Sequence, residues 1–310
     1  MAVSSFEIDA ERAGQRLDNF LVKHYKGVPK ARIFRAIRSG EVRINSKRAK
    51  ASTKLQEKDQ VRLPPLRVKE SNALCLSQAQ IHEAQSWVIG ENDDFLVVNK
   101  PYGLAVHKGT SVAYGVIDAL QLARQTQDLY LVHRLDRHTS GCLLIAKKRQ
   151  AMLALHQAWR ARAVKKIYEA ISAGDRQGKR HWKIDAPLLK TKSSAGPAVV
   201  VSDQGQSALS HVSLMTTIGQ YAHLKIEIET GRMHQIRVHL RHIHLPIIGD
   251  QRYGDFEVNK YIRRQYGLSQ MFLHAASLEF FWEGKRHVFQ CERPQHFDDF
   301  IRVLTSGANI

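Results

Sequence analysis

Cysteine is scarce in this chain, which has only three cysteines among its 310 residues. Cys75, Cys142 and Cys291 stand far apart and none belongs to a C-x-x-C pair, which excludes a disulfide framework and a cysteine zinc site. No apolar run reaches the roughly 18 residues that a membrane-spanning helix needs. The N-terminus also lacks the basic and apolar segments of a signal peptide. We therefore expect a cytoplasmic protein with no membrane partner.

Three motifs that mark common enzyme classes are also missing. The sequence has no G-x-G-x-x-G of a Rossmann fold and no G-x-x-x-x-G-K-[ST] of a P-loop. It also has no G-x-S-x-G nucleophile elbow. These absences argue against nicotinamide, adenosyl-methionine and nucleoside triphosphate chemistry, so we expect no nucleotide cofactor.

Positive charge, by contrast, is in large excess. The chain has 47 Lys and Arg against 29 Asp and Glu, a net charge of +18. Residues 11–70 alone contain 17 basic and 6 acidic residues, which is more than half of that excess. Because 43% of the residues are hydrophobic, the chain can bury a core and is not a disordered polycation. A discrete basic module favours a polyanionic partner, nucleic acid before an anionic membrane.

Apolar spacing within the basic module predicts two short helices followed by strands. The first helix runs from about Arg16 to Tyr25, and the second runs from Lys30 to about Ser39, with Gly40 ending it. A solvated basic helix face is the structural alternative, but it leaves the concentration of charge unexplained. Contact with nucleic acid is expected for seven basic residues of the module: Lys30, Arg32, Arg35, Arg38, Arg43, Lys47 and Arg48.

Over residues 14–65 the module resembles an S4-type RNA-binding domain. The segments that carry the resemblance are AGQRLDNFL, VPKARIFRAIRSGEVRIN and KLQEKDQVRLP. That family is a small α-L motif, which implies that the module reads folded RNA by shape and charge. We place this domain at residues 1–70, a polar linker at 71–86 and a second domain at 87–310.

The densest polar cluster is HRLDRHTSGC at residues 133–142, where Asp136 stands among two arginines and two histidines. Neighbouring cations favour the ionised form of a carboxylate. An ionised Asp can act as a nucleophile, as a base or as an electrostatic stabiliser of an oxocarbenium ion. A structural ion pair at a turn is the alternative. Ser140 or Cys142 as a nucleophile is a weaker hypothesis, because Ser140 stands in a turn sequence and Cys142 begins an apolar run.

A second polar cluster, residues 231–244, contains three arginines and four histidines. Ile236 and Leu240 fit both a helix and a strand, so both structures stay open. The histidines raise the hypothesis of a zinc site. Their spacing matches no familiar zinc signature and the arginines would repel the ion, so we expect no metal. An arginine such as Arg237 would contact RNA or pair with a buried carboxylate.

Alternating polarity around Tyr168 predicts a strand. A tyrosine on a strand most often packs in the core, and stacking on a base is the functional alternative. Other strands are expected at the apolar runs 95–98, 143–146 and 224–228, and a helix at 151–163. The larger domain is therefore expected to be mixed α/β.

Six blocks of this larger domain, in this order, resemble the pseudouridine synthases of the ribosomal large subunit family. They are VVNKPYGLAVH, HRLDRHTSG, KIYEA, TGRMHQIRVHL, PIIGDQRYG and LHAASLEF. The resemblance covers residues 88–282 nearly continuously, and HRLD-x-x-TSG is highly specific. Met233 stands where the family often has Thr, which bears on packing. The resemblance implies an α+β fold, in which the S4-type domain precedes a catalytic domain with a mixed, mainly antiparallel sheet.

The same resemblance implies roles for individual residues. Asp136 takes the position of the catalytic aspartate, and Arg134 that of the arginine that fills the stack when the target uridine is flipped out. Tyr168 matches the tyrosine that stacks on the flipped base and is a candidate base in the sugar chemistry. Arg237 matches the arginine that pairs with the catalytic carboxylate. His133 joins the residues expected to contact RNA.

The implied reaction is the isomerisation of specific uridines in 23S ribosomal RNA. It breaks the N1–C1′ bond, turns the base and joins C5 to C1′, so it needs no cofactor and no metal. A non-catalytic rRNA-binding assembly factor is the alternative, which the loss of Asp136 or Tyr168 would have favoured. We expect a monomer that acts on the RNA of the large ribosomal subunit or its precursor.

Overall fold

A computed structural model describes residues 4–25, 27–66, 76–109, 114–174, 176, 178–193 and 196–306. The chain divides into two compact units: the first comprises residues 1–75 and 148–150, and the second comprises residues 76–147 and 151–310. Each unit has its own hydrophobic core. In the described part of the chain, no helix is long and apolar enough to cross a membrane.

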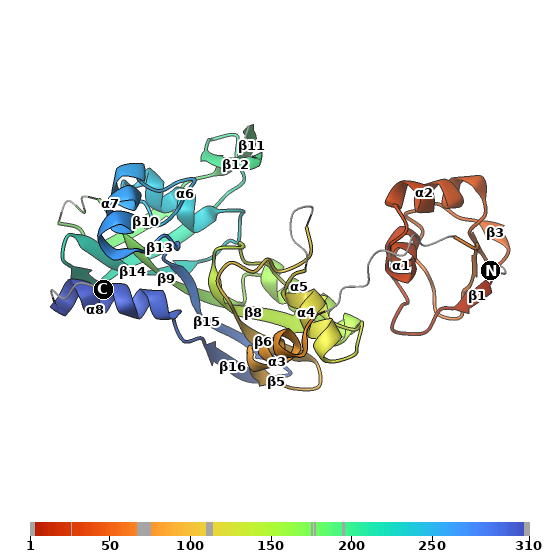
Figure 1. Ribbon diagram of the computed structural model, residues 1–310. Coiled ribbons are helices and arrows are strands. Elements are labelled where there is room, and N and C mark those ends of the chain that lie inside the picture. The colour runs from red at the N-terminus through yellow and green to blue at the C-terminus, as the bar shows by residue number, and fades with distance from the viewer. Residues whose placement is uncertain are drawn as a thin grey trace. The chain divides into compact units, whose positions relative to one another are not determined.

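The N-terminal unit pairs two helices with a small antiparallel sheet (Figure 1). The helices are α1 (Leu17–His24) and α2 (Lys30–Ser39), as the apolar spacing predicts. Gly40 ends α2 with a φ of 78°, a left-handed conformation that glycine adopts without strain. The strands are β1 (Ser4–Glu7), β2 (Arg43–Ile44), β3 (Lys47–Arg48) and β4 (Gln60–Leu63), in the order β1-β4-β2-β3.

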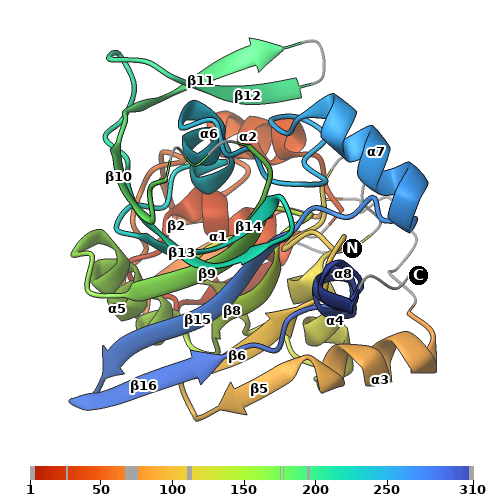
Figure 2. The same cartoon turned by 90° about the vertical axis from the view of Figure 1, so that its left-hand side faces the viewer.

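The second unit is built on a ten-stranded sheet (Figure 2). Its main path has the order β10-β13-β14-β9-β15-β8-β6-β5, and two further strands, β7 and β16, pair with β8 and β15. The strands are β5 (Val88–Glu91), β6 (Phe95–Lys100), β7 (Tyr130–Leu131), β8 (Ser140–Ala146), β9 (Lys165–Ser172), β10 (His181–Asp185), β13 (Leu209–Ile218), β14 (Tyr221–Ile228), β15 (Leu273–Trp282) and β16 (Lys285–Gln290). All pairs are antiparallel except β8 with β15. The mixed, mainly antiparallel sheet is therefore confirmed.

Six helices and a separate hairpin complete the described part of this unit. The helices are α3 (Gln78–Ser86), α4 (Val116–Ala123), α5 (Arg149–Arg160), α6 (Gln235–His242), α7 (Phe256–Tyr266) and α8 (Gln295–Ser306). Strands β11 (Leu188–Ser193) and β12 (Gly196–Val201) form the hairpin, which Figure 2 shows near α6. Residues 231–244 therefore contain a helix, which decides between the two structures that the spacing left open.

The prediction of a linker at residues 71–86 is wrong over the second half of that range. Residues 78–86 form α3, and Ala84 of this helix is fully buried in the core of the second unit. The helix is fixed by a capping box, in which the Ser77 side chain accepts from the backbone of Gln80 and the Gln80 side chain accepts from the backbone of Ser77. Residues 71–75 lie outside the described residues.

The close pairing of β8 with β15 requires the glycine of the TSG sequence. Gly141 has a φ of 108°, and a side chain there would collide with the backbone of Ala275 on β15. Because β8 begins at Ser140, this pairing fixes the end of the polar segment 133–139. Ser140 and Cys142 are buried on this strand, so neither is an accessible nucleophile.

Candidate active site

The segment that carries Asp136 is held against the loop after β6. Within it, the Thr139 N–H donates to the Asp136 carbonyl over 3.1 Å, which closes a turn. Lys100, which is fully buried, donates through Nζ to the carbonyls of Pro101, Leu104 and Arg137 over 2.8, 2.8 and 3.2 Å. Burial lowers the pKa of Lys100 to about 7, although the negative charge of Asp136 acts in the opposite direction. Lys100 therefore links the loop after β6 to the segment that carries Asp136.

Arg137 and His138 also attach this segment to the loop after β6. The Arg137 Nε donates to the carbonyl of Gly103 over 2.9 Å, and His138 Nδ1 lies 3.1 Å from the Tyr102 hydroxyl. That hydroxyl also accepts from the N–H of Met271 over 3.1 Å. Burial, together with the positive charge of Arg137, lowers the pKa of His138, which favours the neutral imidazole. The backbone around Asp136 is thus fixed on both sides.

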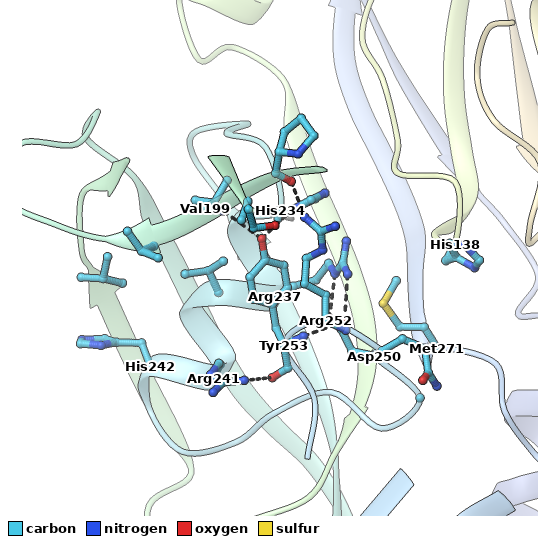
Figure 3. Close-up of a pocket in the computed structure, with 18 of the residues that line it drawn as sticks. His138, Val199, His234, Arg237, Arg241, His242, Asp250, Arg252, Tyr253 and Met271 are labelled. Atoms are coloured by element: carbon cyan, nitrogen blue, oxygen red, sulfur yellow. Dashed lines mark hydrogen bonds and ion pairs between the residues drawn. The ribbon is translucent and has the colours of Figure 1, made fainter. Parts of the chain in front are cut away.

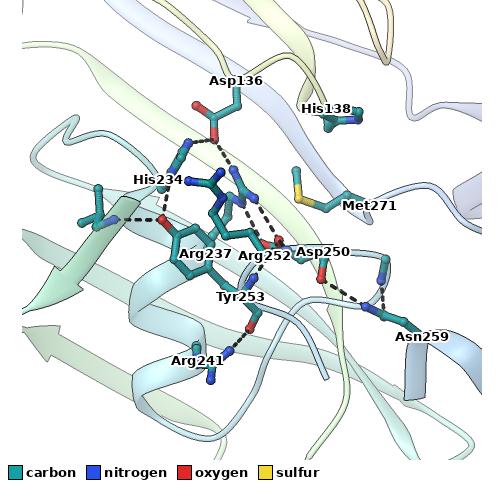
Figure 4. A network of polar contacts seen from close by, with 12 residues as sticks. Asp136, His138, His234, Arg237, Arg241, Asp250, Arg252, Tyr253, Asn259 and Met271 are labelled. Atoms are coloured by element: carbon teal, nitrogen blue, oxygen red, sulfur yellow. Dashed lines mark hydrogen bonds and ion pairs between the residues drawn. The ribbon is translucent and has the colours of Figure 1, made fainter. Parts of the chain in front are cut away.

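Arg237 on α6 binds two carboxylates at once (Figure 4). Its Nη1 donates to Asp136 Oδ2 over 3.0 Å. Its Nε and Nη2 donate to the two oxygens of Asp250 over 2.7 and 2.8 Å. Burial works against the charged guanidinium, but the two carboxylates outweigh it and raise the pKa of Arg237. The structure therefore assigns Arg237 to pairing with carboxylates, one of the two roles that its sequence context left open.

Asp250 is the more buried partner, with a side chain that is 1% exposed against 22% for Asp136. Its Oδ1 also accepts the N–H groups of Arg252 and Tyr253 over 2.9 and 3.0 Å. Burial alone would raise the pKa of Asp250, but Arg237 and these two N–H groups lower it below its usual value. A buried carboxylate with this many donors stays ionised and holds the guanidinium in one orientation.

His234 approaches the same oxygen of Asp136 from the start of α6. It has a φ of 55°, and its Nε2 lies 3.7 Å from Asp136 Oδ2. Its Nδ1 lies 2.8 Å from the Tyr253 hydroxyl, which accepts the N–H of Val199 over 3.0 Å. Burial lowers the pKa of His234, while the charge of Asp136 acts against that shift. Arg237 and His234 both face Oδ2, and among the described residues no hydrogen bond reaches Oδ1 of Asp136.

A cavity of about 70 Å³ opens beside the carboxylate. Asp136, Arg134 and Tyr168 line it together with residues of the segment before α6. Tyr168 lies on β9, is 9% exposed and packs in the main core. It therefore belongs to the core and also lines the cavity. Burial and, to a lesser degree, the charge of Asp136 raise the pKa of Tyr168, which keeps its hydroxyl protonated at neutral pH. Arg134 is exposed at this cavity.

His133 does not line the cavity with Asp136, Arg134 and Tyr168. Its ring stacks on Trp159 with centroids 4.6 Å apart, and its Nε2 accepts the N–H of Leu144 over 3.0 Å. Burial, with a smaller contribution from Lys166, lowers the pKa of His133 to about 3. A neutral ring that accepts a backbone hydrogen bond is part of the packing of this domain. The structure thus favours a structural role for His133 over the RNA contact that we expected.

The seven basic residues expected to contact RNA in the N-terminal unit fall into two groups. Arg32 forms an ion pair with Glu41 at 2.8 Å, and Arg43 donates to the carbonyls of Gly40 and Ser46. These two guanidinium groups therefore have partners within their own unit. The other five are exposed: Lys30, Arg35, Arg38, Lys47 and Arg48.

Sequence reasoning gave no role to Asp250, His234, Tyr253 or Lys100. Asp250 and Tyr253 both lie in the block PIIGDQRYG, and His234 lies immediately before α6. The presence of Asp250 in that block was the only sign in the sequence of a second carboxylate near the site. Its pairing with Arg237 depends on the tertiary fold. In the described ranges, no group of three or more His, Cys, Asp or Glu side chains could hold a metal ion.

Two family patterns match the chain. The family described as RNA pseudouridylate synthase matches residues 94–242, and the S4 domain family matches residues 15–61. The first match contains Asp136, Tyr168 and Arg237. These matches define the class of the protein, which is an RNA pseudouridine synthase, an intramolecular isomerase, with an N-terminal S4 domain.

Curated relatives narrow this class. The chain is 41% identical to the ribosomal large subunit pseudouridine synthase C of Escherichia coli O157:H7, over 97% of this chain and 95% of the relative. It is 44% identical to the protein of that name from Haemophilus ducreyi, over 90% and 88% of the two chains. The chain therefore belongs to the family of ribosomal large subunit pseudouridine synthases with an N-terminal S4 domain.

Solved structures agree with the fold. Human RNA Pseudouridylate Synthase Domain Containing 4 superposes with a TM-score of 0.61 and 23% sequence identity. The match covers 73% of this chain and 97% of the human chain. At this identity the likeness supports the fold alone.

Proposed function

We propose that this enzyme isomerises specific uridines of 23S ribosomal RNA to pseudouridine, with Asp136 as the catalytic carboxylate. The observation that carries the proposal is the placement of Asp136 at a small cavity that Tyr168 also lines, with Arg237 bound to one oxygen of Asp136. The names of the relatives support the large ribosomal subunit as the source of the RNA.

The first step of the proposed mechanism takes the target uridine out of its stack, which costs a few kcal/mol. Arg134 is exposed at the cavity and is the residue proposed to fill the gap left in the RNA. Tyr168 also lines the cavity and is the residue proposed to stack on the extruded base. The cavity therefore provides a position for the base next to the carboxylate.

In the second step, the N1–C1′ bond breaks with Asp136 beside the sugar. The carboxylate either bonds to C1′ or stabilises the positive charge that develops there. Because Arg237 and His234 face Oδ2, the other oxygen is the one free to approach the sugar. The detached base takes up a proton at N1 and turns, and its C5 bonds to C1′, which breaks any bond between C1′ and the carboxylate. The hydrogen on C5 is lost as a proton, so the product has the composition of the substrate. No atom is gained from a second substrate.

The proposal is tested by mapping pseudouridines in unmodified 23S rRNA transcripts treated with the enzyme. Carbodiimide adducts on pseudouridine stop reverse transcriptase, so each modified position gives a new stop. We expect stops with the wild-type enzyme at a small number of positions, none with Asp136→Asn, and none in a 16S rRNA transcript. Stops confined to 16S rRNA would overturn the substrate, and equal stops with Asp136→Asn would overturn the role of Asp136.

A further inference from the structure

A second and larger pocket lies next to the catalytic cavity. Its volume is about 1240 Å³, and it shares His234 and Arg237 with the cavity that contains Asp136. Figure 3 shows residues that line it. Strand β12, helix α6 and the segment after Gly249 form its walls. We call it the flanking pocket. Apart from the two shared residues and from Asp250 and Tyr253, which hold them, its lining has no part in the chemistry proposed above.

The charge of the flanking pocket suits an anion. Its lining contains Arg241 and Arg252, and also Arg237, whose charge is offset by Asp136 and Asp250. Four histidines add ring nitrogens that can form hydrogen bonds with an anion: His138, His234, His242 and His244. Asp250 is the sole carboxylate among the residues that line it. That carboxylate has a side chain only 1% exposed and is paired with Arg237, so it adds little negative potential. A cationic ligand would find no accessible partner here.

One wall of the pocket is apolar and uncovered. Pro197, Val200 and Val201 come from β12, and Val200 is 44% exposed. Arg252 donates to the carbonyl of Pro197, which attaches this strand to the segment after Gly249. Met271 adds a further apolar surface on the side of His138. The pocket therefore offers cationic donors and aliphatic surfaces to the same ligand.

Nucleotides combine negative phosphates with flat faces that pack on aliphatic and aromatic side chains. The volume exceeds the roughly 300–1,000 Å³ of a small-molecule pocket, so it has room for more than one nucleotide. In a paired stem the base faces are stacked and closed to the protein, whereas unpaired bases can be splayed into a pocket. Charge, surface and size thus point to unpaired RNA.

We propose that the flanking pocket binds unpaired nucleotides adjacent to the target uridine in the RNA. This inference rests on the proposed function, because it takes the occupant to be the same RNA whose uridine enters the catalytic cavity. Because the flanking pocket and the catalytic cavity share His234 and Arg237, a nucleotide in the pocket lies close to the reacting nucleotide. The pocket is then a determinant of which uridine is modified.

The first test introduces a negative charge into the apolar wall. Val200→Asp is expected to raise the KM for 23S rRNA about tenfold, since one base contact contributes a factor of that order, and to leave kcat within about twofold of wild type. Val288→Asp is the matched control, because Val288 lies on β16, is 46% exposed and does not line the pocket. Equal KM values for the two variants would overturn the proposal.

The second test locates the RNA without relying on turnover. A short single-stranded RNA that carries one 4-thiouridine is photo-crosslinked to the full-length protein, and the attached peptides are identified by mass spectrometry. We expect crosslinks in residues 197–201 or 269–271, also with Asp136→Asn. Crosslinks confined to other segments overturn the pocket, even where uridine isomerisation is normal. Crosslinks in the pocket together with a complete lack of isomerisation instead contradict the proposed function and leave the pocket standing.

Discussion

Arg237 Nη1 lies 3.0 Å from Oδ2 of Asp136, although the two residues are 101 positions apart in the sequence. The other nitrogens of the same guanidinium bind Asp250, which is nearly inaccessible to solvent. The buried carboxylate therefore fixes the arginine, and the arginine fixes the carboxylate at the cavity. Asp250 is a positioning residue in this account, because it acts on Asp136 through Arg237.

Replacement of Asp250 by Asn should weaken this chain of contacts. Asn keeps the size of the side chain but removes the charge that balances Arg237, which leaves a buried cation with less compensation. We expect the free energy of unfolding to fall by about 3–5 kcal/mol. We also expect kcat to fall about a hundredfold, since a small displacement of a catalytic group has that effect. Urea unfolding and single-turnover kinetics measure the two changes.

Asp255→Asn is the matched control for that experiment. Asp255 lies five positions further on and caps α7 through the N–H groups of Glu257 and Val258, a role that Asn also performs well. Its kcat should equal that of the wild-type enzyme. A wild-type kcat for Asp250→Asn as well would contradict the positioning role.

Tyr168→Phe separates stacking from proton transfer. The ring is kept, so the affinity for RNA should stay within about twofold of wild type. If the hydroxyl takes part in the chemistry, the single-turnover rate should fall about a hundredfold or more, within the usual range for general acid–base catalysis. A wild-type rate would leave Tyr168 with stacking and packing alone. Tyr168→Leu, which lacks an aromatic face, should in either case reduce the rate.

His133 gives a prediction about pH. Burial lowers its pKa from 6.5 to about 3, so below pH 6.5 the unfolded chain binds this proton more readily than the folded protein. The stability due to the neutral ring is therefore complete above pH 6.5 and is lost as the pH falls towards 3. His133→Gln should make the unfolding free energy less dependent on pH in this window, by up to about 1.4 kcal/mol per pH unit.

The same variant tests whether His133 contacts RNA. If its role is structural, His133→Gln binds RNA like the wild-type protein at neutral pH, and urea titrations between pH 4 and 7, at about one-unit steps, show the weaker acid dependence. His181→Gln, at an exposed histidine on β10, should change neither property. A clear loss of RNA affinity with an unchanged acid dependence would restore the role that the sequence suggested.

The basic helix of the S4 domain should make RNA binding dependent on salt. Arg35 and Arg38 are exposed on α2, whereas Arg32 of the same helix is paired with Glu41. The double variant Arg35→Gln/Arg38→Gln should reduce the slope of log affinity against log salt by about 1.5, as expected for two lost phosphate contacts. Arg32→Gln should change the slope less. An unchanged slope in the double variant would exclude this face as the RNA contact.

The elements of the S4 domain could be predicted because their signals are local. Apolar spacing and a glycine after the last turn are enough to define α2. Helix α3 was missed although its signal was also local. The capping sequence from Ser77 to Gln80 stands before a segment so polar that it resembles a linker, and only Ala84 is buried in the helix.

At the candidate site, by contrast, the contacts between residues depend on the tertiary fold and not on local sequence. The sequence motifs point to Asp136, Tyr168 and Arg237 individually, and the structure brings all three to one place. The role of Asp250 could not be predicted, because which carboxylate binds the second side of a guanidinium is decided by the tertiary fold. The packing of His133 could not be predicted for the same reason, since its partner Trp159 lies on a helix beyond the next strand.

The most direct test of the central claim is tritium release from 23S rRNA labelled at C5 of uridine. Formation of the C5–C1′ bond must expel that hydrogen, so release counts turnovers. We predict release with the wild-type enzyme and with Asp255→Asn, and none above background with Asp136→Asn, whose RNA affinity should stay within about twofold of wild type because the carboxylate acts mainly in the transition state. Release by Asp136→Asn at a rate near that of the wild-type enzyme would contradict the account.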